Sequence, residues 1–361
     1  MGFDRILDQH VPVRLLRNIL ASQRVPNGLL FWGPSGVGKR LTAIELAKAI
    51  NCNAAEADAC GQCLSCRKID HGNHPDVHVT VPVKKSRIIN VGAVEQIVEL
   101  AVLRPFEGAW RVFILHDAER MAGPGQNKLL KTLEEPPGQT LFILLTEHPR
   151  MLLPTIRSRC QSVRFGGLSP ETVQSLLMRE RDIDERTATS IAAVAQGQMS
   201  RALELVDSEK REIVFDFLRR LSAGENPLSV SEEFGKYLAS EKAAIESTLK
   251  SQNEPVDTAE WSKEDRERMK EEQQAVADAL SRRGILELLY LIETWYRDKM
   301  VYRATQDGDR VLNRDQLTDL GSTDEENFDE KLGAIEKARV YLERFLNEER
   351  VFRDLFFTLA R

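Results

Sequence analysis

A glycine-rich loop between a short apolar run and a helical pattern constrains this chain more than any other feature. The apolar run 29–32 leads directly into Gly33-Pro34-Ser35-Gly36-Val37-Gly38-Lys39-Arg40, which has the form G-x-x-x-x-G-K followed by Arg. Glycines let the N–H groups of such a loop point inward around phosphate, the lysine adds a positive charge, and the helix expected at 41–50 presents its positive end. The loop therefore predicts an α/β domain that binds a nucleotide.

Two positions depart from the pattern of a phosphate-loop ATPase. Ser or Thr after the lysine holds magnesium through its hydroxyl, whereas Arg40 offers a positive charge and no oxygen ligand. The apolar run 111–115 should be followed by an acidic pair, one residue for magnesium and one for the attacking water. His116 and Asp117 stand there, and in neither possible register is the Asp-Glu pair present. We therefore expect the loop to bind ATP or ADP without hydrolysing it.

Four cysteines follow the loop helix in a spacing typical of a metal site. Cys52 is followed by Cys60, Cys63 and Cys66, the last three in C-x2-C-x2-C spacing. In a reducing cytoplasm this spacing predicts four thiolates around Zn2+, with free or redox-active thiols as the alternative. Because protein ligands would fill all four positions, the zinc would be structural and not catalytic. Cys160 stands apart and is expected to be a buried small side chain.

Length and charge limit the classes of protein to consider. At 361 residues the chain exceeds the usual size of one domain, so two or three domains are expected. It has no apolar run near the ~20 residues needed to cross a bilayer, and its first residues lack the order of a secretory signal. We therefore expect a cytoplasmic protein without membrane contact. A net charge of -6 disfavours a surface coated with nucleic acid but allows a local DNA contact.

The order of the predicted elements divides the chain into two kinds of structure. Strands at 77–82, 111–115 and 141–145 alternate with helices at 91–103 and 126–135, which predicts a parallel sheet covered by helices on both faces. After about residue 166 only helical patterns remain. Short helices are expected to about 208, and longer ones at 213–221, 231–250, 262–281, 285–301 and 332–359. The charged segment 225–283 predicts a protruding or partly mobile helical hairpin.

Two further segments, taken with the loop and the cysteines, carry a family resemblance. They are Leu129-Leu130-Lys131-Thr132-Leu133-Glu134-Glu135-Pro136-Pro137 and Ser158-Arg159-Cys160. With them, the first 165 residues resemble the delta-prime subunits of the bacterial replicative clamp loader, in the AAA+ superfamily. The resemblance implies an AAA+ nucleotide-binding domain with a zinc knuckle (1–166), a small helical lid domain (167–208) and an all-α C-terminal collar domain (209–361) that joins five subunits into an open ring.

The gamma/tau motor subunits of the same machine are the nearest alternative. They share the knuckle, the L-L-K-T-L-E-E-P-P helix and the Ser-Arg-Cys triplet, but keep Thr after the lysine and the Asp-Glu pair. The resemblance therefore implies a non-motor accessory subunit of the DNA polymerase III holoenzyme, not catalytic by itself. Its partners would be the motor subunits and the delta subunit in a hetero-pentamer, the sliding clamp, and primed DNA reached through the complex. A zinc-dependent nucleic-acid-binding protein is the alternative from another class.

The resemblance also implies a role for Arg159. It would act in trans as an arginine finger on ATP held by the neighbouring motor subunit, whereas the alternative is a surface arginine paired with a carboxylate. Whether Arg157 takes part is left open. The lid arginine of the family would fall near Ser200 or Arg201, and no nucleotide contact is assigned to either.

Overall fold

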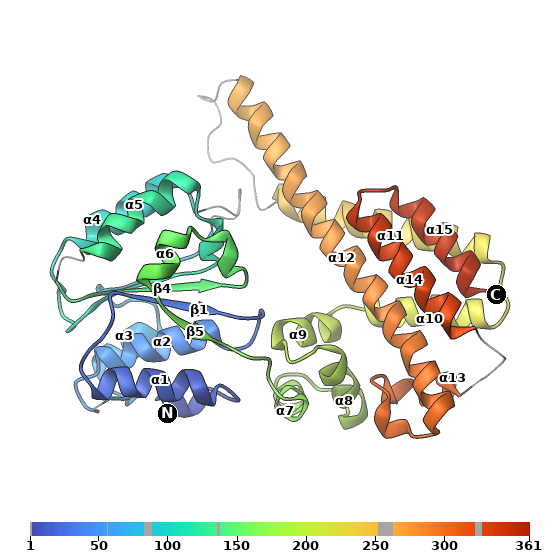
Figure 1. Cartoon of the computed structure of the whole chain (residues 1–361), viewed down its shortest axis with the longest axis horizontal. Coiled ribbons are helices and arrows are strands. Elements are labelled where there is room, and N and C mark those ends of the chain that lie inside the picture. Colours follow the sequence, from blue (N-terminus) through green and yellow to red (C-terminus); the bar gives the residue numbers. More distant parts are fainter. Residues whose placement is uncertain (1, 56, 83–88, 136–137, 252–262, 322–326) are drawn as a thin grey trace. The chain divides into compact units, whose positions relative to one another are not determined.

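The structure is a computed structural model that describes all residues except 1, 56, 83–88, 136–137, 252–262 and 322–326 (Figure 1). Its residues form two compact units. The first holds most of the chain up to Val173 together with Gln196–Arg201, and the second holds Gln174–Ala195 and Ala202–Arg361. The domain boundaries expected at 166 and 208 remain predictions.

A five-stranded parallel sheet forms the centre of the first unit. Its strands are β1 (Gly28–Trp32), β2 (Val77–Thr80), β3 (Arg111–Leu115), β4 (Thr140–Thr146) and β5 (Gln161–Arg164), in the spatial order β2-β3-β4-β1-β5. Every pairing is parallel, with Trp32 of β1 opposite Thr146 of β4. Because parallel strands end at the same edge, the residues after β1, β3 and β4 gather at one edge of the sheet, where open α/β folds bind ligands.

Helices cover both faces of this sheet, as predicted. One face carries η1 (Gly2–Arg5), α1 (His10–Ala21), α2 (Lys39–Ile50) and α3 (Leu64–Asp70). The other carries α4 (Val91–Ala101), η2 (Ala118–Arg120), α5 (Gly123–Glu134), η3 (Pro149–Met151) and α6 (Pro154–Arg159). Alternate strand residues enter the two cores, so Leu29 and Phe31 pack on one side and Leu30 on the other.

Strand β5 is absent from the elements predicted from the sequence. Of its four residues only Val163 is buried, so no apolar run marks it. It lies at the edge of the sheet and pairs with β1 through residues from Gln161 to Arg164. Such a strand owes its place to pairing with a buried neighbour, which a local pattern does not reveal.

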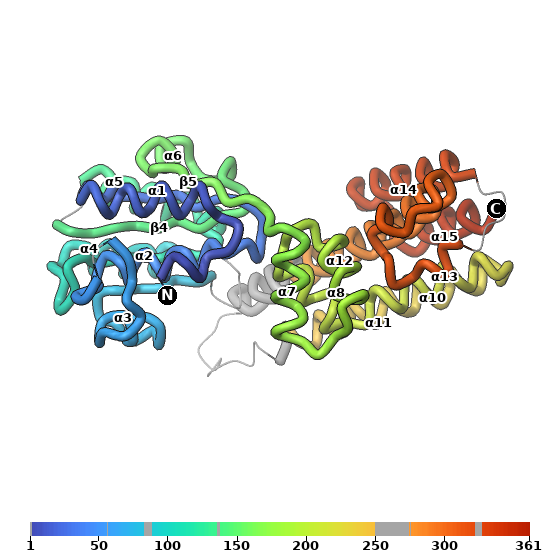
Figure 2. Tube along the Cα trace, turned by 90° about the horizontal axis from the view of Figure 1, so that it is seen from below, coloured from blue at the N-terminus to red at the C-terminus, as the bar shows by residue number. Residues whose placement is uncertain are grey.

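The rest of the chain is helical, as predicted. Its helices are α7 (Pro170–Glu180), α8 (Glu185–Val194), α9 (Met199–Asp207), α10 (Lys210–Ser222), α11 (Pro227–Ser251), α12 (Lys263–Thr305), η4 (Gly308–Arg310), η5 (Arg314–Gln316), α13 (Leu317–Leu320), α14 (Phe328–Glu343) and α15 (Glu348–Leu359). Helices α10, α11, α12, α14 and α15 pack into a bundle (Figure 2). Among the helices that the structure describes, none combines the length and apolar character needed to span a membrane.

Two helical segments are divided differently from the prediction. The segments 262–281 and 285–301 form the single helix α12, because one Gly284 in a run of helix formers costs only about 1 kcal/mol. The segment 332–359 is divided at Phe345, whose φ of +62° ends the first of two helices. The charged segment 225–283 forms α11 and the start of α12, which contact each other. Its residues 252–262 lie outside the described part of the chain.

Candidate functional site

The phosphate loop joins β1 to α2 and depends on glycine at specific positions. Gly36 and Gly38 have φ of +70° and +95°, a left-handed region that residues with a Cβ rarely adopt. A Cβ on Gly33 would meet the carbonyl oxygen of Phe165 at 2.3 Å, and one on Gly36 would meet the backbone nitrogen of Ser200 at 2.3 Å. The loop therefore has the tight glycine curl that the motif requires.

Lys39 begins α2 and folds back onto the loop. Its Nζ donates to the carbonyl oxygens of Gly33 and Pro34, both at 2.6 Å. Burial lowers the pKa of Lys39, and the carboxylates of Glu147, Glu119 and Asp117 act in the opposite direction. The ammonium is thus held at the start of the loop, within the field of three carboxylates that follow β3 and β4.

The positive charge of Arg40 acts on the buried imidazole of His116. Burial lowers the pKa of His116, and the positive charges of Arg40 and Lys39 lower it further, against the opposing effect of Asp117. The imidazole is therefore neutral at pH 7. Among the described residues, His116 Nε2 and Glu119 Oε2 are buried without a hydrogen-bond partner. The structure thus brings together the two departures from the ATPase pattern, and neither supplies a magnesium-binding carboxylate.

One contact of the phosphate loop, and one contact between the segments that flank the first unit's helices and strands, come from residues to which the sequence assigned no role. Ser200, at the start of α9, sits against Gly36 with its backbone nitrogen and its hydroxyl. Gln9 exchanges two hydrogen bonds with the backbone of Gly166, at 2.9 and 3.1 Å, and so fastens the segment before α1 to the segment after β5. Neither residue type carries a sequence signal for this role, because Ser and Gln are common on any surface.

The four predicted zinc ligands lie together. The Sγ atoms of Cys52, Cys60, Cys63 and Cys66 are all within 4.8 Å of one another. Cys63 caps α3, with its sulfur accepting from the Cys66 N–H at 3.4 Å, and the Cys60 sulfur accepts from the Cys63 N–H at 3.3 Å. Tetrahedral zinc with Zn–S bonds of about 2.3 Å spaces its sulfurs about 3.8 Å apart. The cluster fits that ion after a small contraction.

The pKa shifts of these thiols are also consistent with a bound cation. The N–H groups of Cys63 and Gln62 lower the pKa of Cys60 to about 6. Burial raises the pKa of Cys63, but the N–H groups of Cys66 and Asn53 outweigh it and the net shift is downward. Burial raises the pKa of the Cys66 thiol, so its thiolate needs a nearby positive ion. With four protein ligands, a zinc ion here has no open position for substrate.

A buried carboxylate supports the segment beside the cluster. Asp76 accepts backbone hydrogen bonds from Phe106, Glu107 and Gly108 at 2.7 to 2.9 Å, and Arg111 Nη2 lies 3.0 Å from it. Burial raises the pKa of Asp76, but these donors outweigh it, so the net shift is downward. The carboxylate ties the loop before β3 to the start of β2.

Cys160 lies where the sequence predicts it, buried in the core beneath β1 and away from the cluster. Burial alone raises the pKa of its thiol to about 12. A Cβ on Gly28 would lie 2.8 Å from its sulfur. The side chain is therefore a packing element held as the neutral thiol.

Arg159 ends α6 and is engaged within its own chain. Its Nη2 lies 2.6 Å from Glu134 Oε1 at the end of α5, and its Nη1 donates to the carbonyl oxygen of Thr155 at 3.1 Å. The side chains of Arg159 and Glu134 are 36% and 45% exposed. The structure thus shows a surface ion pair, which is the alternative to the arginine-finger role. Both ends of the pair come from motifs that carried the family resemblance.

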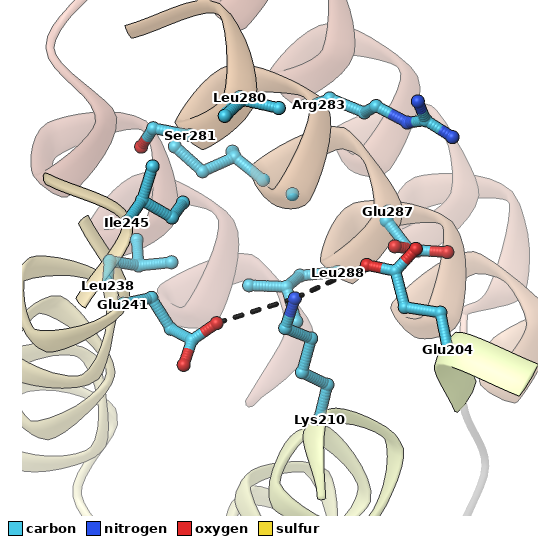
Figure 3. A pocket seen from close by; sticks show the side chains of 12 residues that line it. Glu204, Lys210, Leu238, Glu241, Ile245, Leu280, Ser281, Arg283, Glu287 and Leu288 are labelled. Atoms are coloured by element: carbon cyan, nitrogen blue, oxygen red, sulfur yellow. Dashed lines mark ion pairs between the residues drawn. The ribbon is translucent and has the colours of Figure 1, made fainter. Parts of the chain in front are cut away.

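A cavity of about 250 Å³ lies in the second unit, among residues of α9, α10, α11 and α12 (Figure 3). Apolar side chains such as Leu238 and Leu288 line it, and Lys210 lies 3.4 Å from Glu241 and 3.6 Å from Glu204. None of its lining residues belongs to the phosphate loop or to the cysteine cluster. The candidate site therefore rests on the loop and the cluster, where the sequence motifs lie.

Residues 8–169 match the model of the family described as DNA polymerase III, delta subunit. The Bacillus subtilis DNA polymerase III subunit delta′ is 33% identical over 210 residues, which are 56% of this chain and 62% of the relative. The subunit delta′ of Pseudomonas aeruginosa is 41% identical over 132 residues, 36% of this chain and 40% of the relative. The matches thus span less than two thirds of these relatives.

Relatives with another subunit name also match. The Bacillus subtilis subunit tau is 31% identical over 211 residues, 57% of this chain and 37% of the relative. A solved structure titled as a DNA polymerase III gamma subunit-related protein from Thermotoga maritima aligns over 98% of this chain and 99% of its own, with 17% identity and a TM-score of 0.43. The family match covers the phosphate loop, the cysteines and Arg159. Over residues 8–169 the chain is therefore similar to DNA polymerase III delta′ subunits.

Proposed function

We propose that this chain is a non-motor subunit of the cytoplasmic replicative clamp loader, which places a sliding clamp on primed DNA. One observation carries the proposal. The phosphate loop keeps its glycines and Lys39, while Arg40 and His116 occupy the sequence positions where a motor ATPase has magnesium ligands, and the charge of Arg40 acts on the His116 imidazole. Such a loop can bind ATP or ADP, but it lacks the carboxylate and hydroxyl that position the metal for hydrolysis.

We infer the partners from the similarity to delta′ subunits. The chain would join motor subunits and a delta subunit in a hetero-pentamer, with the helices after residue 208 serving as its collar domain. It would meet the sliding clamp and primed DNA as part of that complex. Zinc bound by the four cysteines would hold the knuckle together.

Arg159 supplies the chemistry of the proposal. In the assembled ring it would reach the γ-phosphate of ATP on the neighbouring motor subunit and stabilise the charge of the transition state. Residues acting in this way contribute about 10³–10⁵ in rate. Its partly exposed position at the end of α6 supports the proposal, because a buried arginine could not reach another subunit.

Turnover by a reconstituted loader whose only ATP-competent site adjoins this chain tests the proposal. Arg159→Ala should lower clamp- and primer-stimulated ATP hydrolysis by about 10³-fold with assembly preserved. Arg150→Ala is the matched control, because Arg150 is also exposed and lies in the short helix before α6. Unchanged hydrolysis in the Arg159→Ala loader would refute the trans role.

A motor subunit is the second candidate, favoured by the 31% identity to subunit tau. Under that reading the isolated chain hydrolyses ATP, and Lys39→Ala abolishes the activity. Under our proposal the isolated chain shows no turnover that depends on Lys39. Steady-state ATP hydrolysis by the purified chain and by its Lys39→Ala variant separates the two.

A further inference from the structure

We propose that Glu134 is a positioning residue for Arg159, holding the guanidinium in the orientation in which it meets the phosphate of a neighbouring subunit. The inference rests on the proposed trans role of Arg159. It adds a residue from another helix, one that does not itself touch the nucleotide.

The guanidinium is held from two directions. Glu134 Oε1 lies 2.6 Å from Nη2, while Nη1 donates to the carbonyl oxygen of Thr155 at 3.1 Å and lies 3.5 Å from the Ser158 hydroxyl. A guanidinium has five N–H donors in one plane, so contacts at both terminal nitrogens define that plane. Among the described residues the Nε–H has no partner, which leaves a donor for an incoming oxyanion.

The two ends of the ion pair stand on a common rigid support. Glu134 follows Leu133, which is 3% exposed, and Arg159 lies one helical turn from Ile156, which is fully buried. Both apolar residues belong to the same core, and α5 and α6 contact each other. The positions of the two backbones are therefore set by packing, and Glu134 needs only to select one conformation of the long arginine side chain.

Selecting that conformation before the subunits meet favours catalysis. A free arginine at the surface samples many rotamers, and ordering it during the reaction costs entropy that a pre-oriented group has already lost. Because the ion pair is exposed, its contribution to the orientation of Arg159 is modest. The guanidinium can still bind a second anion. Glu134 would thus act on the turnover number and leave ATP binding unaffected.

The test uses the reconstituted loader with one competent site next to this chain. Glu134→Ala and Glu134→Gln should each lower kcat roughly two- to fivefold, with KM for ATP unchanged, because both remove the charge that holds Nη2. Glu135→Ala is the matched control, since it removes the same charge one residue further along and leaves the ion pair to Arg159 in place. Its kcat should equal that of the unaltered loader.

Combining the variants separates positioning from a structural effect. In the Arg159→Ala background, adding Glu134→Ala should cause no further loss, because the residue acts only through Arg159. A further loss of the same size, an equal loss with Glu135→Ala, or a rise in kcat on removing Glu134 would each overturn the inference. If Arg159→Ala itself has no effect, the proposed function fails. If Arg159→Ala lowers turnover and Glu134→Ala does not, only the inference about Glu134 fails.

Discussion

The cysteine cluster and the phosphate site contrast two ways of building a site in one domain. All four cysteines lie between residues 52 and 66, and their sulfurs converge within 4.8 Å. The phosphate site instead draws on the loop after β1, on His116 and Glu119 after β3, on Glu147 after β4 and on Ser200. The cluster offers a complete ligand set for a metal, whereas the phosphate site has the cradle without the metal ligands.

This difference shows that two equally recognisable sequence motifs can differ in whether the groups needed for their chemistry are present. A cysteine cluster can bind zinc once its ligands lie together, because the thiolates fill all four positions around the metal. A phosphate loop is one part of an assembly, and its activity depends on groups delivered by other strands. Here those strands deliver a neutral imidazole within the field of an arginine, and for this reason we propose that the loop binds a nucleotide without hydrolysing it.

Breaking the cluster should have the largest effect. Cys66→Ser removes a fully buried ligand, so the purified variant should contain less than one zinc per chain and lose about 4 kcal/mol or more of unfolding free energy. Elemental analysis and thermal unfolding measure the two quantities. Cys160→Ser is the matched control, because it makes the same change at a buried thiol outside the cluster and should keep the zinc. An unaltered Tm in the zinc-free variant would contradict a structural metal.

Removing the buried carboxylate beside the cluster should have the next largest effect. Asp76→Asn leaves Arg111 buried without its ion-pair partner and should lower the free energy of unfolding by about 3 kcal/mol. The pKa of Asp76 is lowered in the folded state, so its contribution is present above the ordinary value of 3.8 and is lost as the pH falls through the folded value.

Denaturant unfolding from pH 3 to pH 7 measures this contribution. The difference between the unaltered chain and Asp76→Asn should shrink as the pH falls below about 4, because Asp76 then gains a proton in the unfolded chain while the folded chain still keeps the carboxylate charged. Asp70→Asn changes a carboxylate whose side chain is 34% exposed and serves as the control, with a smaller loss. A difference independent of pH would mean that packing, and not charge, accounts for the effect.

Restoring the magnesium ligands of the phosphate site should have the smallest effect on free energy. It tests most directly whether this site differs from the cysteine cluster only by lacking metal ligands. Arg40→Thr combined with His116→Asp restores a hydroxyl and a carboxylate, so Mg²⁺ should tighten ATP binding by roughly tenfold, about 1.4 kcal/mol. In the unaltered chain Mg²⁺ should change the Kd by less than about twofold. Fluorescence anisotropy of a labelled ATP, with and without Mg²⁺, measures both.

Adding Lys39→Ala to that double variant supplies the control, because the loop lysine binds phosphate whether or not the metal is present. The triple variant should bind ATP more weakly in both conditions. Strong Mg²⁺ dependence in the unaltered chain would show that other groups hold the ion and would weaken the non-motor proposal.

The sequence predicted the elements whose residues carry a strong local pattern. The apolar runs of β1, β3 and β4 and the C-x2-C-x2-C spacing were identified correctly, because burial on both faces and metal ligation each leave a dense signature. Strand β5 was missed since only Val163 is buried, and α12 was divided at Gly284 since a glycine suggests a boundary. The division of 332–359 at Phe345 was also missed, because no glycine or proline marks it.

By itself the sequence determined that the chain contains a parallel α/β domain with a phosphate loop and four clustered cysteines, because these features depend on residues close together in the chain. Only the tertiary structure decided that the charge of Arg40 lowers the pKa of His116 and that Arg159 forms an ion pair with Glu134. The members of each pair lie on different elements, and their approach depends on strand order and helix packing. Contacts of this kind leave no trace in local spacing.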